Sequence, residues 1–309
     1  MRLIRLTPDA TPEQGMGTVT ALGFFDGVHL GHRRLLEAAV TEAAARGLVP
    51  AVFTFSDDVR SVKPGASRLT DFESKLRLLE EAGIELVYAA DFSALSSYPP
   101  ETFVREVLVS LCRTELAVCG FNFRFGRGAS GDAEQLRFLM RGLGREARII
   151  DPAYLGDRVI SSSAIRLALE SGEPELAAAM LGRPFSLTAP VLRGRGFGHT
   201  EGVPTVNQVF CTSGIVPKSG VYASRVILED GRAVQGVSNV GVCPTFFGES
   251  GDLRCETHLI DYEKDLYGKT LSVQFCKYLR SEKKFKTVDE LYEQIRCDVK
   301  AAREIKTNP

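Results

Sequence analysis

The feature that most constrains the fold is an alternation of two patterns over the first 184 residues. Short apolar runs rich in β-branched and aromatic residues are separated by longer segments of helical period. The runs are residues 18–25, 50–55, 86–92, 116–123 and 147–151. This alternation is typical of βαβ units, whose parallel strands are covered by helices on both faces. Residues 1–184 are therefore expected to form an α/β domain with a parallel sheet.

Beyond residue 184, Pro and Gly become frequent and the helical period gives way to short strands. The expected strands are residues 221–228, 234–242, 255–262 and 270–279. Asp230-Gly231 separates the first two, and this dipeptide favours a hairpin because it tolerates the positive φ values of a type I′ turn. Short meandering strands lose their exposed edges when the sheet closes. We predict an antiparallel β-barrel domain over residues 185–309, ending in an amphipathic helix at residues 287–305.

Composition excludes several classes of protein. The 309-residue chain has a formal charge of -1 and no basic block, so a nucleic-acid partner is not expected. It contains no run of ~18 apolar residues, which predicts a cytoplasmic protein with no membrane partner. Its seven cysteines form no C-x-x-C pair and are expected to be buried thiols rather than zinc ligands. Homo-oligomer formation stays open.

The most specific local motif is the run Gly-Phe-Phe-Asp-Gly-Val-His-Leu-Gly-His at residues 23–32. It lies where the first strand ends and the first helix begins, at the edge where open α/β sheets bind ligands. His29 and His32 can face a phosphate at the helix N-terminus, with Gly31 allowing close backbone approach. Nucleotidyl transfer needs donors that neutralise charge on the α-phosphate and the departing pyrophosphate. We therefore expect a triphosphate site, and the alternative is that the imidazoles only cap a helix.

A second motif, Ser-Ser-Ser-Ala-Ile-Arg at residues 161–166, opens a later helical stretch. Its serines, Ser162 and Ser163 among them, can cap that helix, and Arg166 lies one turn in, where it can reach a phosphate. Taken alone, the motif favours a plain helix cap. Combined with the two histidines, it predicts an adenylyltransferase site with donors from both ends of the domain.

A competing motif lies between these two. Residues 126–131 spell G-x-G-x-x-G, and Asp151 follows at roughly the spacing of a ribose-binding acid, which indicates an NAD-dependent oxidoreductase. However, the motif is in the middle of the βα series and would leave His29 and His32 without a role. We expect instead a loop that lets backbone approach the substrates. Asn122 and the phenylalanines around it suit a flavin ring or a nucleotide, although a buried strand would also explain the phenylalanines.

The second half contains a glycine-rich stretch, residues 194–207, that ends in Pro-Thr-Val-Asn. The chain has no G-x-x-x-x-G-K-[ST] motif, so a kinase here would not be a P-loop enzyme. Thr205 and Asn207 lie two residues apart in an extended segment, point the same way and offer oxygens suited to Mg²⁺. Glu256 and His258 share a face of a later strand, where a carboxylate could take a proton from an alcohol. The alternative for this face is a solvated outer surface.

Taken together and in this order, the motifs resemble those of the bacterial bifunctional riboflavin kinase/FAD synthetases over residues 15–305. The first half matches the family segments G-x-F-D-G-x-H-x-G-H, G-x-[DN]-F-x-F-G and S-S-[ST]-x-I-R. The resemblance implies a Rossmann-like nucleotidyltransferase domain that converts FMN and ATP to FAD and pyrophosphate with Mg²⁺. It implies His29, His32 and Arg166 as catalytic residues. The binding residues that it implies are Gly23, Phe25, Asp26, Gly31, Asn122, Ser162 and Ser163.

The second half is similar to the riboflavin kinase barrel of the same family, whose P-T-A-N motif corresponds to residues 204–207. The resemblance implies that Gly198, Thr205 and Asn207 bind Mg-ATP and that Glu256 is the base for the riboflavin 5′-hydroxyl. In place of the family's usual Arg, Leu, Ala and Arg, the chain carries His199, Glu201, Val206 and Cys243. The alternative is therefore an FAD synthetase whose barrel is a weakened kinase that binds flavin or a partner.

Overall fold

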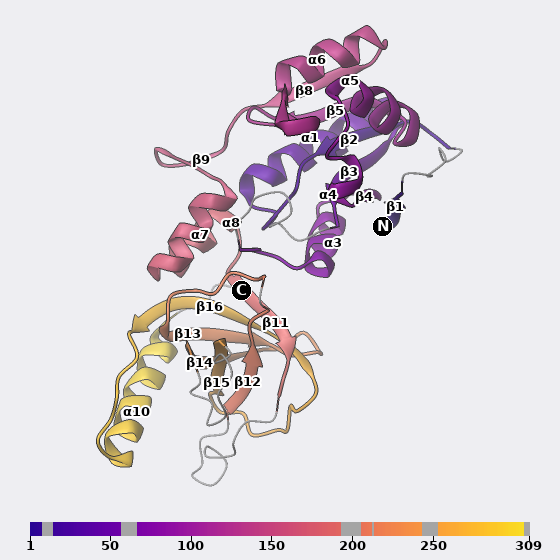
Figure 1. The fold of residues 1–309 in the computed structure, drawn as a ribbon. Coiled ribbons are helices and arrows are strands. Elements are labelled where there is room, and N and C mark those ends of the chain that lie inside the picture. The colour runs from indigo at the N-terminus through magenta and orange to yellow at the C-terminus, as the bar shows by residue number, and fades with distance from the viewer. Residues whose placement is uncertain (8–14, 57–66, 193–204, 212, 243–252, 306–309) are drawn as a thin grey trace. The chain divides into compact units, whose positions relative to one another are not determined.

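The chain divides into two compact units, Met1–Ser162 and Ser163–Pro309, each with its own sheet (Figure 1). The computed structural model describes residues 1–7, 15–56, 67–192, 205–211, 213–242 and 253–305. The division falls before residues 163–184, which the helical period placed with the α/β half. This segment packs with the second unit, where the backbone N–H of Lys218 donates to the carbonyl of Leu169 at 3.0 Å.

The first unit contains a six-stranded sheet in the order β1-β4-β3-β2-β5-β8. The strands are β1 (Arg2–Leu6), β2 (Thr18–Leu22), β3 (Val49–Phe55), β4 (Leu86–Ala90), β5 (Thr114–Gly120) and β8 (Glu146–Ile150). Every neighbouring pair is parallel, which confirms the sheet expected from the sequence. The edge strand β1 was not predicted, because two arginines interrupt its short apolar run and its pairing with the buried β4 is what orders it.

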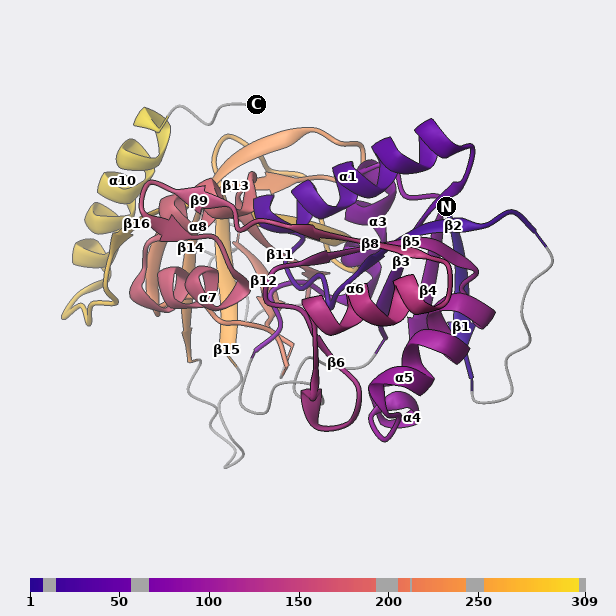
Figure 2. The ribbon, with the colours of Figure 1, turned by 90° about the horizontal axis from the view of Figure 1, so that it is seen from above.

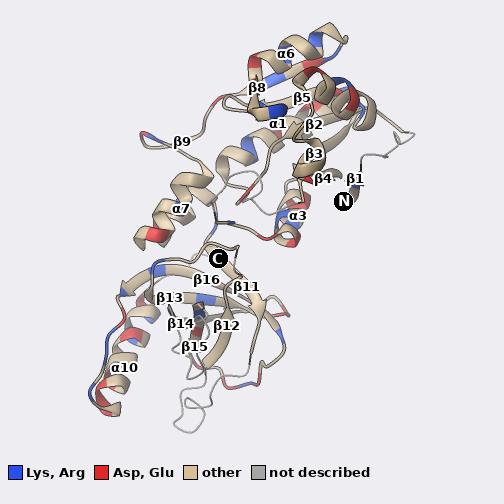
Figure 3. Ribbon diagram, in the orientation of Figure 1, with Lys and Arg blue, Asp and Glu red and all other residues tan. Residues whose placement is uncertain are grey.

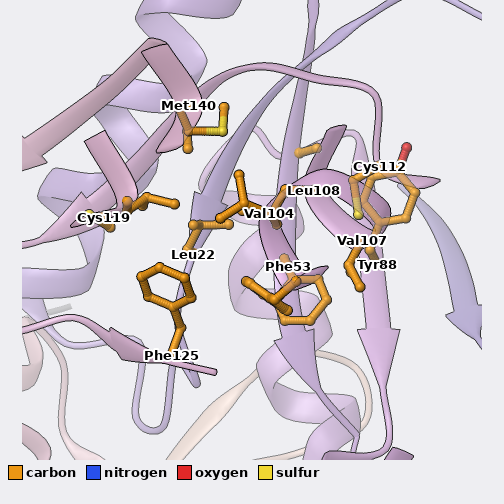
Figure 4. Close-up of a cluster of buried hydrophobic side chains, with 14 of the residues drawn as sticks. Leu22, Phe53, Tyr88, Val104, Val107, Leu108, Cys112, Cys119, Phe125 and Met140 are labelled. Atoms are coloured by element: carbon orange, nitrogen blue, oxygen red, sulfur yellow. The ribbon is translucent and has the colours of Figure 1, made fainter. Parts of the chain in front are cut away.

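Helices cover both faces of this sheet (Figure 2). On one face, α1 (Leu30–Arg46) and α3 (Phe72–Glu81) enclose an apolar core that includes Leu36 and Leu79. On the other, the π-helix η1 (Phe103–Leu111) and α6 (Ala133–Gly142) enclose a second core that includes Leu108 and Met140 (Figure 4). The connecting elements are α4 (Phe92–Leu95), α5 (Pro100–Thr102), β6 (Arg124–Phe125), η2 (Arg127–Ala129), β7 (Gly131–Asp132), β9 (Tyr154–Leu155) and β10 (Arg158–Val159).

The second unit is an antiparallel six-stranded sheet that begins after two helices, α7 (Ser162–Ser171) and α8 (Pro174–Leu181). In spatial order its strands are β11 (Phe185–Pro190), β16 (Thr270–Arg280), β13 (Gly220–Ile227), β14 (Ala233–Val242), β15 (Leu253–Leu259) and β12 (Thr205–Val209). A bridge between Leu192 and Asn207 joins the two outer edges. The buried side chain of Gln208 also donates to the carbonyl of Leu271 at 2.9 Å. These contacts close the sheet into the predicted barrel.

The helix α10 (Val288–Glu304) confirms the amphipathic helix expected at the end of the chain, and it lies against β13 and β14. Thr287 caps it by accepting a hydrogen bond from the backbone N–H of Glu290 at 3.2 Å. Leu291, an apolar residue of this helix, is 38% exposed. The helix is instead held partly by a buried polar contact, because Asp298 accepts hydrogen bonds from Arg280 at 3.0 and 2.7 Å.

The predicted hairpin between β13 and β14 forms, but its turn is not the expected type I′. That turn needs positive φ at both central residues, and of Asp230 and Gly231 only the glycine has one, at 81°. The loop is longer, since the N–H groups of Leu228 and Gly231 donate to the carbonyls of Arg232 and Leu228. In this longer loop, a positive φ is needed at one residue, and Gly231 supplies it.

The surface charges and the cysteines match the expectations from the sequence only in part. Lys and Arg are interspersed with Asp and Glu along α6 and α10 (Figure 3), and none of the described helices is long and apolar enough to cross a bilayer. Burial raises the thiol pKa of Cys119 to about 12 and that of Cys255 to about 11, as expected of inert core cysteines. Cys211 and Cys297, however, are exposed, contrary to the expectation of buried thiols.

Candidate functional site

The strand order of the first unit reverses between β2 and β5. Strands β3 and β4 follow on one side of β2, whereas β5 and β8 lie on the other. In open parallel sheets, ligands bind outside the carboxyl ends of the strands at such a reversal. The loop after β2 carries residues 23–29, and the loop after β5 carries Asn122. Two of the predicted motifs therefore flank the same point of the sheet edge.

The turn after β2 has a strained backbone. Phe25 and Val28 have φ values of 55° and 39°, and both side chains are fully buried. Non-glycine residues rarely adopt this region, and holding a residue there costs about 1–3 kcal/mol. Such conformations persist where the surroundings fix them, and they concentrate at functional sites. The contacts around this turn therefore determine how His29 is presented.

Asp26 is one of the groups that fix this turn. Its carboxylate is buried and accepts hydrogen bonds from the backbone N–H groups of Leu69 at 2.9 Å and Thr70 at 3.3 Å. The Asp26 carbonyl accepts a third from the hydroxyl of Ser162 at 2.9 Å. The structure thus brings the serine-rich motif to the turn and gives Asp26 a structural role. Its predicted contact with a ligand stays a prediction.

His29 is the N-cap residue of α1. Its Nδ1 accepts a hydrogen bond from the backbone N–H of His32 at 3.2 Å. A nitrogen that accepts carries no proton, so the neutral imidazole has its hydrogen on Nε2, which can donate. The ring of His32 stacks on that of His29, with centroids 3.7 Å apart. The two predicted histidines therefore lie together at a helix N-terminus, where backbone N–H groups also favour an anion.

The glycines of this motif leave space for aromatic rings of the same motif. A Cβ at Gly31 would lie 3.1 Å from atoms of the His29 imidazole, and one at Gly23 would lie 3.2 Å from the Phe25 ring. Phe25 in turn packs against His32, with ring centroids 5.2 Å apart. These residues were predicted to bind the nucleotide. In the structure, Gly31 and Phe25 lie against the histidine rings and Gly23 lies against Phe25, and direct contact with a ligand stays a prediction.

Three further predicted residues lie near the ends of elements. Asn122 is exposed in the turn after β5, where the backbone N–H of Phe123 donates to the carbonyl of Gly120 at 3.0 Å. Arg166 is buried one turn into α7, which belongs to the second compact unit, and Ser163 is exposed at the start of that helix. The assignment of Arg166 and Ser163 to the same site as His29 stays a prediction.

Sequence reasoning missed Lys75, a buried lysine of α3 with an exposure of 3%. Its ammonium group donates to two backbone carbonyls and one hydroxyl at the carboxyl ends of β2 and β3. Lys75 also lines a small pocket together with Phe24, Asp26, Ser56, Arg68, Thr70 and Phe72. The available signal was the position of Lys75 four residues before Leu79, on the apolar side of a segment of helical period, where a lysine is uncommon.

The glycine-rich residues 126–131 are used within their own loop. They connect β6 and β7 in a small hairpin outside the six-stranded sheet. A Cβ at Gly126 would lie 2.8 Å from Pro100, and one at Gly131 would lie 2.7 Å from the ring of Phe125. The glycines therefore allow the loop to pack on Pro100 and Phe125. The middle glycine, Gly128, has open space around it and a positive φ of 64°.

In the barrel, strand pairing brings three of the predicted kinase residues together. Asn207 on β12 is opposite Glu256 on β15, and Thr205 is opposite His258. Directly opposed residues on neighbouring strands have Cβ atoms about 5 Å apart. Cys255 and Thr257 point into the buried interior of the barrel. Glu256, which lies between them, and the cross-strand residues that share its face therefore lie on the outer face. Glu256 is nevertheless only partly exposed there.

The same row extends to a residue that the sequence analysis did not select. Asn239 on β14 is opposite Glu256 on the side away from Asn207, and its amide donates to Glu282 at 3.2 Å. A Cβ at Gly241 would clash with the Glu282 carboxylate, so this glycine makes room for it. The only signal for Asn239 was an amide among the small and apolar residues at the end of β14. Gly198, His199, Glu201 and Cys243 lie outside the described residues.

A magnesium ion would fit the chemistry of this row. Among the described residues, no group of three or more His, Cys, Asp or Glu side chains could hold a metal by itself. Mg²⁺ usually takes one or two protein oxygens and completes its shell with water and substrate phosphates. The Thr205 hydroxyl and the Asn207 amide oxygen, on the face that carries Glu256, are of that kind.

Comparison with known proteins covers both units. A family model for FAD synthetase matches residues 11–164, and one for riboflavin kinase matches residues 181–306. The chain is 34% identical to the bifunctional riboflavin kinase/FMN adenylyltransferase of Bacillus subtilis over 94% of its length and 93% of that protein. It is also 34% identical to the Escherichia coli protein of the same name, over 98% of this chain and 97% of that one.

A solved structure is similar over the whole chain. It is described as a macrolide-efflux protein from Streptococcus pneumoniae, and it superposes with a TM-score of 0.88 at 27% identity. The match covers 98% of this chain and 99% of the other. The order of the two units is thus shared over full length with proteins from several bacteria.

Proposed function

The chain belongs to the family of bifunctional riboflavin kinase/FMN adenylyltransferases, and from this membership we propose that it makes FMN from riboflavin and FAD from FMN. ATP is the second substrate of both reactions. We assign FAD formation to residues 1–184 and riboflavin phosphorylation to residues 185–309. The observation that carries the proposal is the placement of His29 and His32 where the strand order reverses.

In the adenylyl transfer, an oxygen of the FMN phosphate attacks the α-phosphorus of ATP, and the bond to pyrophosphate breaks. Negative charge develops on the oxygens of the α-phosphate and on the pyrophosphate. The Nε2–H of His29 and the first N–H groups of α1 supply donors for that charge. His32 stacks on His29 and limits its rotation. Mg²⁺, bound with ATP, would neutralise further phosphate charge.

In the kinase reaction, the riboflavin 5′-oxygen attacks the γ-phosphorus of ATP and ADP leaves. Glu256 accepts the proton of the 5′-hydroxyl as the new bond forms. Asn207 and Asn239 flank this carboxylate on the two neighbouring strands, which fixes the row across the sheet. Thr205 and Asn207 would hold Mg²⁺ and so orient the ATP phosphates.

The direct test is product analysis of the unmodified protein. Incubation with FMN, ATP and Mg²⁺ is expected to give FAD, and incubation with riboflavin in place of FMN is expected to give FMN and then FAD. Chromatography separates the three flavins, and samples lacking Mg²⁺ or ATP are the controls. Absence of FAD in the first sample would contradict the assignment of the α/β unit.

The alternative, an FAD synthetase with a weakened kinase barrel, is favoured by the departures His199 and Cys243, which replace arginines of the family pattern. Arginine offers five donors, whereas neutral histidine offers one and cysteine almost none. Another of the four departures, Val206, is buried on the interior face and leaves the Thr205 and Asn207 face unchanged. Under this alternative, riboflavin is converted slowly, and His199→Arg combined with Cys243→Arg raises kinase kcat/KM.

A further inference from the structure

Lys75 is the one buried lysine among the described residues of the first unit, and the adenylyl transfer as described above does not use it. Its Nζ donates to the carbonyl of Phe24 at 3.2 Å, to the hydroxyl of Thr54 at 3.2 Å and to the carbonyl of Phe55 at 2.9 Å. An ammonium group has three hydrogens. All three are therefore directed at the carboxyl ends of two adjacent strands.

The Phe24 carbonyl is the point where this cluster meets the strained turn. It accepts a second hydrogen bond from the Thr54 hydroxyl at 3.0 Å, so Thr54 and Lys75 hold the same atom. Phe25 and Val28, which follow, have positive φ values and are fully buried. His29 then begins α1. A shift of the Phe24 carbonyl would therefore be transmitted through the turn to His29.

The two rings beside the ammonium fix its position further. Nζ lies 4.7 Å from the centroid of Phe24 and 5.1 Å from that of Phe72. A cation over an aromatic face is attracted by the ring quadrupole. The ammonium group of Lys75 thus makes both hydrogen bonds and cation–π contacts with the two rings.

We propose that Lys75 is a positioning residue for FAD formation, because it ties the Phe24 carbonyl to the end of β3 and so sets the place of His29 and His32. The inference rests on the proposed function of this unit. Lys75 acts through the turn and does not itself touch the reacting atoms. Its loss is expected to lower kcat for FAD formation more than it raises KM for ATP or FMN, since displaced charge-stabilising donors matter most in the transition state.

The titration of Lys75 gives the proposal a second readout. Burial lowers the pKa of Lys75 from 10.5 to about 8; of the charged groups facing it, Asp26 on the turn opposes this shift and Arg68 on the preceding loop adds to it. The groups that β3 contributes are a carbonyl and a hydroxyl. Above pH 8 the amine becomes neutral, keeps two hydrogens and presents a lone pair to one of three acceptors. The hold of Lys75 on the Phe24 carbonyl and on the end of β3 is then weakened.

The test compares Lys75→Met, Lys75→Arg and Thr54→Val in the full-length protein. Arg77→Met is the matched control, because Arg77 is an exposed cation on the same helix. We expect kcat for FAD formation to fall ten- to a hundredfold in Lys75→Met, since small displacements of catalytic groups have effects of that order. Thr54→Val is expected to lower kcat severalfold. Because both residues act on one carbonyl, the double variant is expected to lose less than the product of the two single losses.

The pH dependence and the other reaction separate positioning from damage to the fold. The ratio of wild-type kcat to Lys75→Met kcat is expected to decline as the pH rises through about 8, whereas Lys75→Arg keeps its charge and shows no such decline if it folds. The urea unfolding transition of the first unit reports whether each variant is intact, and riboflavin phosphorylation in the second unit, which the substitutions do not touch, normalises the amount of active protein. If Lys75→Met does not fold, Thr54→Val carries the test.

The possible results are distinct. A wild-type protein that makes FAD, together with a folded Lys75→Met variant of unchanged kcat, would overturn the inference alone. A larger effect on KM than on kcat, or a wild-type to variant ratio that is constant with pH, would also overturn it. A wild-type protein that makes no FAD would overturn the proposed function, and the inference with it.

Discussion

At the scale of single residues, hydrogen-bond geometry separates the groups that shape the site from those that can reach a ligand. Asp26, Gly23 and Gly31 belong to the motif; Asp26 ties the turn to the backbone of Leu69, and the two glycines leave space for rings of the motif itself. His29 has both kinds of role, because its Nδ1 caps α1 and its Nε2 carries the hydrogen of the neutral ring. A motif thus combines residues that build a conformation with residues that act from it.

The two roles of His29 can be tested separately. Asparagine is a good N-cap residue but has no imidazole. We expect both His29→Asn and His29→Ala to lower the rate of FAD formation on the order of 10²-fold, because both remove one preorganised donor. The free energy of unfolding of the first unit should fall by about 1 kcal/mol in His29→Ala and by much less in His29→Asn. Chemical denaturation and steady-state kinetics give the two quantities.

The control for this comparison is His258→Asn, an imidazole of the other unit. It should leave the rate of FAD formation unchanged. Retention of full FAD formation in His29→Asn would show that the imidazole is only a cap, which is the alternative that the sequence left open.

At the scale of elements, a buried ion pair decides how α10 is held on the barrel. Asp298 and Arg280 have side-chain exposures of 6% and 16%, and Gln294 also donates to this carboxylate at 3.0 Å. Arg280 ends β16, two residues before Glu282, which accepts from Asn239 beside Glu256. The Arg280–Asp298 contact that fixes the last helix is therefore close in sequence to the Asn239–Glu282 contact beside Glu256.

Asp298→Ala is expected to destabilise the second unit by roughly 2–3 kcal/mol, because it leaves the Arg280 guanidinium largely buried without its partner. The matched control is Arg303→Ala, which removes an exposed pair with Asp261 and should change the free energy of unfolding by less than about 1 kcal/mol. Urea denaturation, with the kinase rate as the probe of the folded second unit, measures the free energy of unfolding of both variants. Equal destabilisation by the two variants would contradict a special role for the buried pair.

At the scale of the whole molecule, two units with separate sheets predict two separable activities. His29→Asn is expected to convert riboflavin to FMN and stop there. Glu256→Gln, which removes the base, is expected to convert FMN to FAD but to leave riboflavin unchanged. A mixture of the two variants should convert riboflavin to FAD, because FMN released by one can be used by the other. Failure of the mixture to exceed the His29→Asn variant alone would show that FMN is not released.

The sequence by itself determined what local chemistry can encode. The alternation of apolar runs and helical segments predicted the parallel sheet, and the hairpin pattern predicted the antiparallel barrel. The spacing of His29 and His32 predicted their joint position at a helix N-terminus. Each of these depends on residues that are neighbours in the chain, so each has a periodic or short-range signal.

Only the tertiary structure decided which distant groups meet. Lys75 reaches Phe24 and Thr54, which are 51 and 21 residues away, and Asn239 joins the row of Glu256 through strand pairing. No local pattern encodes these contacts, because they depend on which strands become neighbours in the sheet. The G-x-G-x-x-G run shows the converse, since its first and last glycines allow close packing against Pro100 and Phe125. A short motif fixes a backbone conformation, and the surrounding fold determines what that conformation is used for.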